Sequence, residues 1–132
     1  MAAPIRRHCD IHGPYAAARA RAEVHRLVQE ALLAGGLVDQ AVEDDAALVV
    51  SELVGNAVRH AGGVCSLDLS LEPDGLDIDV SDSSPETPRP RATDTTSEGG
   101  RGWGIVARLT SELSVQGDGR GKTVHAHIDQ AH

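Results

Sequence analysis

The sequence predicts a two-layer α+β sandwich in which helices cover one face of a mostly antiparallel sheet. Three observations indicate this fold class. Two amphipathic helical segments follow one another near the N-terminus, a hairpin of alternating polarity follows them, and a third helix precedes two more strands. The chain has 132 residues, of which 40% are hydrophobic, so residues 1–132 suffice for a single domain with its own core. Because only 2% are aromatic, that core must be aliphatic.

The N-terminal half is expected to contain a strand and two helices. Residues 4–12 are predicted to form the entry strand, residues 15–34 the first helix and residues 39–61 the second. Paired glycines at 35–36 and 62–63 end the two helices. The apolar stripes have helical spacing and consist of Val24, Leu27, Val28, Ala31 and Leu32, and of Val50, Leu53, Val54, Ala57 and Ala61.

A β-hairpin is expected next. Leucines at 67, 69 and 71 alternate with polar residues, and Leu76, Ile78 and Val80 do the same on the second strand. Between them, Pro73-Asp74-Gly75 is a turn sequence, since proline presets φ and glycine accepts positive φ. One face of this hairpin should therefore be buried.

The C-terminal part begins with a segment that lacks hydrophobic periodicity. Residues 83–99 contain three prolines and many hydroxyl groups, which predicts a mobile loop. A glycine cluster at 99–104 closes it, and a short helix with Ile105, Val106 and Leu109 on one face follows. The last two strands are expected near residues 113–116 and 122–128.

Charge and cysteine usage exclude several classes of protein. The net charge is −8, with 20 acidic and 12 basic residues, which argues against direct binding of nucleic acid or of an anionic membrane. The chain has no apolar run of the ~20 residues that span a bilayer and no signal-peptide pattern, so a cytoplasmic protein is expected. Cys9 and Cys65 lack the spacing of a disulfide scaffold or zinc site, and His125 and His127, which share a strand face, have no evident third ligand.

One edge of the second helix carries polar residues at helical spacing. Glu52, Asn56 and Arg59 are four and three residues apart, so they lie on one face, away from the apolar stripe. The same pattern describes the solvent face of an ordinary amphipathic helix. Asn56 is a poor residue for a helix interior, and Gly55 costs ~1 kcal/mol relative to Ala there. These two residues favour a turn that something approaches closely.

Asp82 is the second candidate site residue. It continues the alternation of Leu76, Ile78 and Val80, which directs its side chain toward the buried face, where an unpaired charge would be costly. Alternatively, the strand ends one residue earlier and Asp82 caps the loop. In a cleft, this carboxylate could accept a hydrogen bond from an exocyclic amine such as that of adenine.

The third candidate is the sequence Gly100-Arg101-Gly102-Trp103-Gly104, which opens a helix. Glycines let backbone N–H groups approach phosphate oxygens, and a helix N-terminus favours anions. Glycine-rich loops are common, so this motif acquires meaning only together with the other two.

In this order and spacing the motifs resemble the GHKL ATPase superfamily over essentially the whole chain, and in particular the anti-sigma-factor serine kinases and their actinobacterial relatives. SELVGNAVRHA at 51–61 resembles the N box, Asp82-Ser83-Ser84-Pro85 the first glycine box, EGGRGWGIVARL at 98–109 the second, and GKTVHAHI at 121–128 the terminal strand. The resemblance implies the Bergerat ATP-binding fold.

The resemblance also implies a role for each matching residue. Glu52 would be the general base, and Asn56 would coordinate Mg²⁺ on the phosphates of ATP. Asp82 would bind the adenine amine, with Thr123 reaching the same end of the site. Residues 83–99 would form the ATP lid. The remaining nucleotide-binding residues would be Arg59, Ser84, Gly100, Arg101, Gly102 and Gly104.

One departure from the family pattern bears on function. The wider superfamily has DxGxG at the first box, and this chain has Asp82-Ser83-Ser84-Pro85, so both glycines are absent. The leading hypothesis is an ATP-dependent protein serine/threonine kinase that binds a sigma factor or a STAS-type anti-sigma antagonist and phosphorylates a serine of the antagonist. A non-catalytic module that uses nucleotide to shape its partner surface, and a degenerate scaffold without nucleotide, stay open, as does a homodimer.

Overall fold

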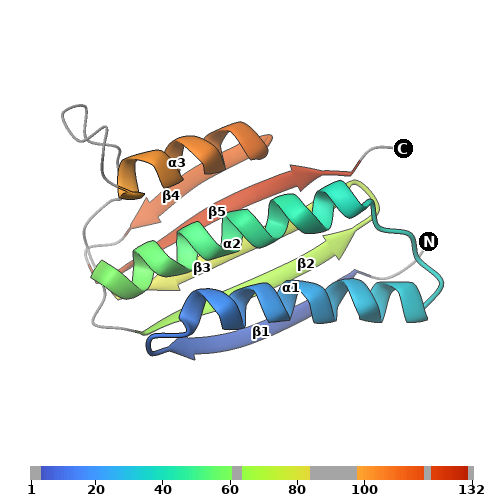
Figure 1. Ribbon diagram of the computed structural model, residues 1–132, viewed down its shortest axis with the longest axis horizontal. Helices are drawn as coiled ribbons and strands as arrows, with labels where there is room; N and C mark the ends of the chain where they lie inside the picture. Colours follow the sequence, from blue (N-terminus) through green and yellow to red (C-terminus); the bar gives the residue numbers. More distant parts are fainter. Residues whose placement is uncertain (1–3, 61–63, 84–97, 118–119, 131–132) are drawn as a thin grey trace.

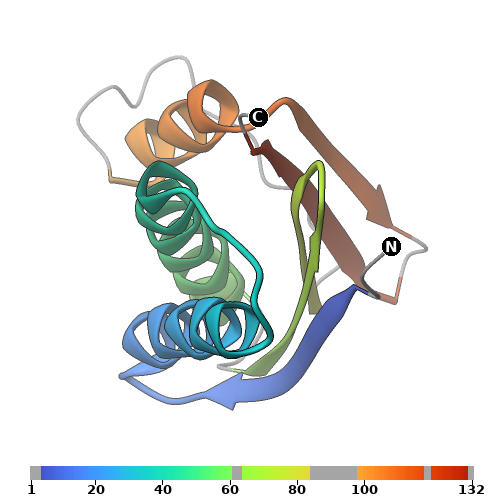
Figure 2. The same ribbon diagram turned by 90° about the vertical axis from the view of Figure 1, so that its right-hand side faces the viewer.

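The computed structural model describes residues 4–60, 64–83, 98–117 and 120–130, and these form one sheet with helices on one side. The sheet has the strand order β1-β2-β3-β5-β4, and every neighbouring pair is antiparallel. Figures 1 and 2 show all three helices on the same face, which confirms the predicted fold class. The elements are β1 Ile5–His12, α1 Ala16–Leu33, α2 Gln40–His60, β2 Val64–Glu72, β3 Gly75–Asp82, α3 Glu98–Leu109, β4 Glu112–Gly117 and β5 Lys122–Asp129.

The core fills the space between the helices and the sheet. α2 lies over the middle of the sheet, with α1 toward β1 on one side and α3 toward β4 on the other (Figure 2). The largest fully buried side chains of the core come from both the helices and the sheet, and all are aliphatic: Ile11, Val24, Leu27, Val49, Val50, Val54, Leu67, Leu76, Ile78, Val80 and Val106. None of the helices in the described ranges combines the length and apolar content that a membrane crossing requires.

The turn between β2 and β3 depends on Gly75, as its turn sequence predicts. Gly75 has a φ of 154°, and a Cβ added to it would lie 2.2 Å from the carbonyl oxygen of Ile128. The close approach places the hairpin beside the end of β5. Any side chain at this position would separate the two strands.

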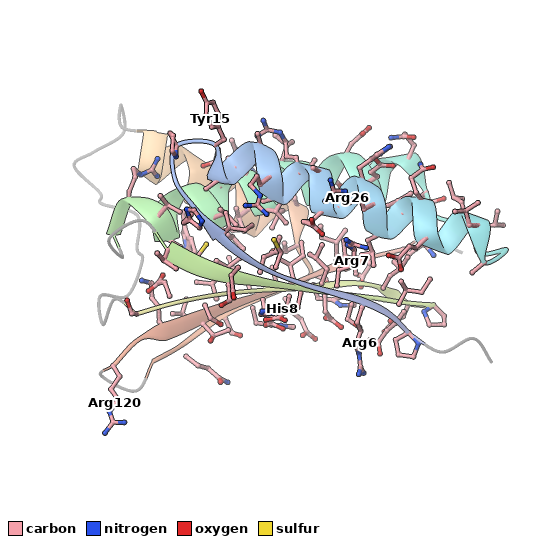
Figure 3. All side chains as sticks on the ribbon, turned by 90° about the horizontal axis from the view of Figure 1, so that it is seen from below. Arg6, Arg7, His8, Tyr15, Arg26 and Arg120 are labelled. Carbon is pink, nitrogen blue, oxygen red and sulfur yellow. The ribbon has the colours of Figure 1, made fainter. Side chains whose placement is uncertain are left out.

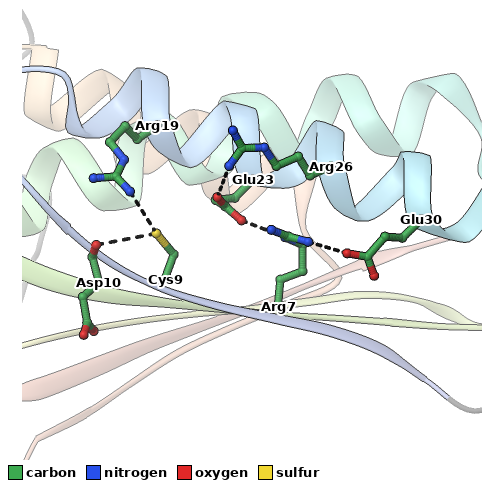
Figure 4. Close-up of polar contacts among 7 residues, drawn as sticks. All are labelled: Arg7, Cys9, Asp10, Arg19, Glu23, Arg26 and Glu30. Carbon is green, nitrogen blue, oxygen red and sulfur yellow. Dashed lines mark hydrogen bonds and ion pairs between the residues drawn. The ribbon is translucent and has the colours of Figure 1, made fainter.

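A cluster of charged residues joins β1 to α1 (Figure 4). Arg7 Nε donates to Glu23 Oε2 at 2.7 Å, its Nη1 contacts Glu30, and Arg26 Nη1 donates to Glu23 Oε1 at 2.8 Å. The Glu23 side chain is only 7% exposed. Burial raises the pKa of Glu23, but the hydrogen bonds and charges of Arg7 and Arg26 outweigh it, and the net pKa is lowered. No local pattern in the sequence predicts this cluster, because Arg7 and Glu23 are sixteen residues apart.

The uncovered face of the sheet is polar. In Figure 3, Arg7 points toward α1, whereas Arg6 and His8 point away from the helices. Asp68 on β2 lies directly opposite Asp79 on β3, which brings two like charges together. Each has a histidine on its other side, since His8 contacts Asp68 at 2.6 Å and His125 contacts Asp79 at 2.7 Å.

Candidate functional site: two helices in contact and a buried ion pair

The polar edge of α2 touches the glycine segment of α3. A Cβ added to Gly102 would lie 2.0 Å from Glu52 Oε2, so the Glu52 carboxylate rests against the backbone at this position. Gly102 is buried, and only a residue without a side chain leaves room for Glu52 where it stands. Two motifs that are about fifty residues apart in the sequence therefore meet at one point.

The glycine segment differs from the expected loop. α3 begins at Glu98, so the residues from Gly99 to Gly104, which include Gly100 and Arg101, are helical and form its first two turns. Glycine disfavours helix by ~1 kcal/mol per residue, but packing against α2 overrides this preference. Gly104 differs from Gly102, because a Cβ added there would meet nothing within 4 Å. The first turn of α3 still supplies backbone N–H groups that no carbonyl within the helix accepts.

Asn56 and Arg59 continue the same edge of α2. Asn56 is half-buried, as Glu52 is, and lies one turn farther along the helix. Arg59 is exposed near the helix end. Glu52 therefore lies against α3, Asn56 lies one turn farther along the same edge of α2, and Arg59 is exposed to solvent.

Asp82 points into the helix-covered face, as its alternation predicts. Its side chain is 1% exposed and forms an ion pair with Lys122, whose side chain is 3% exposed. Lys122 Nζ lies 3.0 Å from Oδ1 and 2.9 Å from Oδ2, so one ammonium group holds both carboxylate oxygens. Lysine is almost never fully buried unless it is paired. Sequence reasoning missed Lys122, although it shares the buried face of β5 with Val124, Ala126 and Ile128.

The charge of Asp82 reaches a neighbouring thiol. Burial, together with the nearby negative charge of Asp82, raises the pKa of Cys65 to about 11. Cys65 is 3% exposed and has no disulfide partner. The thiol should be unreactive, since the thiolate is the reactive form.

Thr123 lies on the opposite face of β5 from Lys122, at the same end of the sheet as Asp82. Side chains of a strand alternate between its faces, and Lys122 occupies the covered face. Thr123 therefore lies on the open face, where its hydroxyl is 2.8 Å from that of Ser81. The role of Thr123 at the adenine end of the site stays a prediction, and Lys122, one residue away, is the residue that contacts Asp82.

A depression of about 500 Å³ opens at this end of the sheet. Its lining includes Asp82 and Lys122 together with the polar residues Ser81, Gln116 and Thr123, and with Gly117 at the end of β4 and Arg120 and Gly121 before β5. Neither Glu52 nor Asn56 lines it. Gly121 is tightly placed, because a Cβ added to it would lie 2.4 Å from the carbonyl oxygen of Asp82.

Part of the predicted site lies outside the described residues. Ser84 and residues 84–97 of the predicted lid belong to this part, and residues 98 and 99 of the predicted lid are the first residues of α3. The assignment of Ser84 to nucleotide binding and of residues 83–99 to an ATP lid remains a prediction.

The sequence of this domain matches a known protein family. Residues 15–128 match the model of the histidine kinase-like ATPase domain, which is most of the chain and includes all three motifs. The chain belongs to the histidine kinase-like ATPase domain family. No curated protein matches it in sequence.

Solved structures share the fold of this ATPase-family domain. The RsbU and RsbW domains of Rv1364c from Mycobacterium tuberculosis match with a TM-score of 0.68 at 20% identity, over 95% of this chain and 32% of that one. The histidine kinase domain of the Erythrobacter litoralis EL346 blue-light activated histidine kinase matches with a TM-score of 0.53 at 24% identity, over 83% of this chain and 64% of that one. The Acinetobacter baumannii histidine kinase AdeS matches with a TM-score of 0.54 at 14% identity, over 96% of this chain and 68% of that one. The chain thus spans about a third of the first of these proteins.

Proposed function

We propose that this protein binds Mg-ATP and acts as a regulator of the anti-sigma-factor serine kinase type. The observation that carries the proposal is the contact between Glu52 and Gly102, which joins the polar edge of α2 to the start of α3. Membership of the histidine kinase-like ATPase family and the fold shared with an RsbW domain support it.

The residues present at this contact fit a nucleotide with its magnesium ion. Asn56 offers an amide oxygen, the kind of hard ligand that Mg²⁺ takes. Gly104 carries no side chain, and a Cβ added there would meet nothing within 4 Å, so phosphates could approach the first turns of α3 on that side, and a helix N-terminus favours anions. Magnesium, when bound, would neutralise the phosphate charge. Asp82 would accept a hydrogen bond from the base, with Gly100, Arg101, Arg59 and Ser84 as further nucleotide contacts.

We propose that a protein serine is the phosphate acceptor. Phosphoryl transfer asks mainly for positioning and charge neutralisation. Glu52 would accept the proton of the serine hydroxyl while the serine oxygen bonds to the terminal phosphorus of ATP and ADP leaves. The protein partner would be a sigma factor or a STAS-type anti-sigma antagonist, and the antagonist would carry the serine.

The test of this proposal begins with capture of partners from the native cell, with and without ATP. A captured antagonist is then incubated with labelled ATP and the wild-type protein or Glu52→Gln. We expect a labelled serine with the wild type and a loss of about 10²–10⁴-fold in rate with the variant. A partner that is captured only with ATP and never labelled would contradict the kinase assignment. It would instead favour a non-catalytic module, which the missing glycines of the first box also motivate.

A matched pair of glycine variants tests whether the contact itself matters. Gly102→Ala places a methyl group where Glu52 Oε2 stands, whereas Gly104→Ala meets nothing within 4 Å. We expect Gly102→Ala to lower the labelling rate at least about tenfold, because a small misplacement of a catalytic group is costly. A rate for Gly102→Ala equal to that of the wild type would show that the position of Glu52 does not matter.

A further inference from the structure

Lys122, the buried ion-pair partner of Asp82, is a residue that the proposed function does not use. Lys122 is 6% exposed as a residue and is the one buried lysine or arginine among the described residues. Its Nζ lies within 3.0 Å of both oxygens of the carboxylate assigned to the base. A nucleotide base that approaches Asp82 therefore meets an acceptor and a donor side by side.

The hydrogen-bonding edges of the purines differ at the atom that would face this pair. Adenine has an amino group at position 6, which donates to a carboxylate. Guanine and hypoxanthine have an oxygen there, which only accepts. A carboxylate that faced only position 6 would disfavour the 6-oxo purines, because two acceptors would face each other.

Lys122 changes this selection. Its ammonium group has three N–H donors, and a 6-oxo group can accept one of them. The protonated ring nitrogen next to that oxygen can then donate to Asp82. For adenine the roles reverse, since the amine donates to Asp82 and the neighbouring ring nitrogen accepts from Lys122.

We infer that Lys122 is a specificity-determining residue, which lets the site accept 6-oxo purine nucleotides such as GTP as well as ATP. This inference rests on the proposed function, because it assigns Asp82 to the base. The fold supplies the donor through the strand register, in which Lys122 lies directly opposite Asp82, and the tight packing of Gly121 on the Asp82 backbone holds the two strand ends together.

The test compares ATP, GTP and ITP in calorimetric titrations of the full chain with magnesium. ITP has the 6-oxo group but lacks the 2-amino group of GTP, so it isolates the contact to Lys122. For the wild type we expect the dissociation constants of GTP and ITP to lie within about tenfold of that of ATP. For Lys122→Met we expect both ratios to rise at least about tenfold.

Arg120→Met is the matched control, since it removes an exposed cation that lines the same depression. We expect this variant to keep the wild-type ratios. Unchanged ratios in Lys122→Met would overturn the inference and leave the proposed function standing. If Lys122→Met does not fold, wild-type ratios of a hundredfold or more against both GTP and ITP would overturn it equally. A wild type that binds none of the three nucleotides would remove the proposed function and the inference together.

Discussion

Both faces of the sheet carry ion pairs, but in opposite environments. On the helix-covered face, the side chains of Asp82 and Lys122 are 1% and 3% exposed. On the open face, those of His8 and Asp68 are 57% and 50% exposed. The buried pair loses the solvation of both charges, so each depends on the other, whereas water solvates the exposed pair and weakens it. Loss of one partner should therefore destabilise the protein much more at the buried pair than at the exposed pair, although the contact distances are similar.

Asp82→Ala should show the largest effect. The substitution leaves the Lys122 ammonium in the interior without its counter-ion, and we expect a loss of about 3–5 kcal/mol in the free energy of unfolding. Urea titration followed by circular dichroism measures it. Asp68→Ala is the matched control on the open face, and its midpoint should stay close to that of the wild type. Similar losses for the two variants would contradict the comparison between the faces.

Glu23→Gln should show the next largest effect. The wild-type carboxylate is buried between Arg7 and Arg26, and we expect its neutral replacement to cost about 1–3 kcal/mol at pH 7. Because the pKa of Glu23 is lowered in the folded state, this contribution is present above the ordinary value near 4.5 and is lost as the pH falls through the folded value.

Chemical denaturation of Glu23→Gln at several pH values measures this difference. The deficit of the variant should shrink below about pH 4. Glu30→Gln is the control, since that side chain is 48% exposed and contacts only Arg7 in the cluster, and it should cost clearly less. A larger loss for Glu30→Gln than for Glu23→Gln would reverse the expected order.

His127→Gln should have the smallest effect and a pH dependence of the opposite sign. Burial lowers the pKa of His127, but the hydrogen bond and charge of Asp77, with Asp74 and Asp129, outweigh it, and the net pKa is raised. The contribution is complete below the ordinary value near 6.5 and is lost as the pH rises through the raised value.

We therefore expect the wild type to be more stable than His127→Gln by less than about 1 kcal/mol near pH 6. The difference should decline toward pH 8, as measured by thermal unfolding across this range. A difference that grows with pH would show that the neutral ring, and not the charged one, is stabilised.

Most of the fold could be predicted from residue periodicity. The stripe of Val24, Leu27, Val28 and Ala31 and the alternation of Leu76, Ile78 and Val80 are buried as predicted, and the expected element order is the observed one. Leu32, which the same spacing placed in the stripe, is 46% exposed. The glycine segment could not be placed in a helix, because glycine disfavours helix locally and only the packing of α3 on α2 reverses that preference.

Less of the site could be predicted from the sequence, because it depends on the pairing register of the strands and on contacts between residues that are far apart in the sequence. Alternation correctly directed Asp82 inward, but the match to the terminal strand favoured Thr123 over Lys122 by one residue. A pairing register for β3 and β5 would have placed Lys122 opposite Asp82. The Arg7–Glu23 contact joins residues sixteen positions apart on different elements, and no local pattern reports it.

The central claim is that the edge of α2 and the start of α3 together bind a magnesium-bound triphosphate. Calorimetric titration of ATP into the wild type and Asn56→Ala, each with MgCl₂ and then with EDTA, tests it most directly. We predict that the wild type binds ATP more tightly with magnesium and that Asn56→Ala loses this magnesium-dependent gain. Equal magnesium-dependent affinity in both proteins, or no binding by the wild type at millimolar ATP, would contradict the claim.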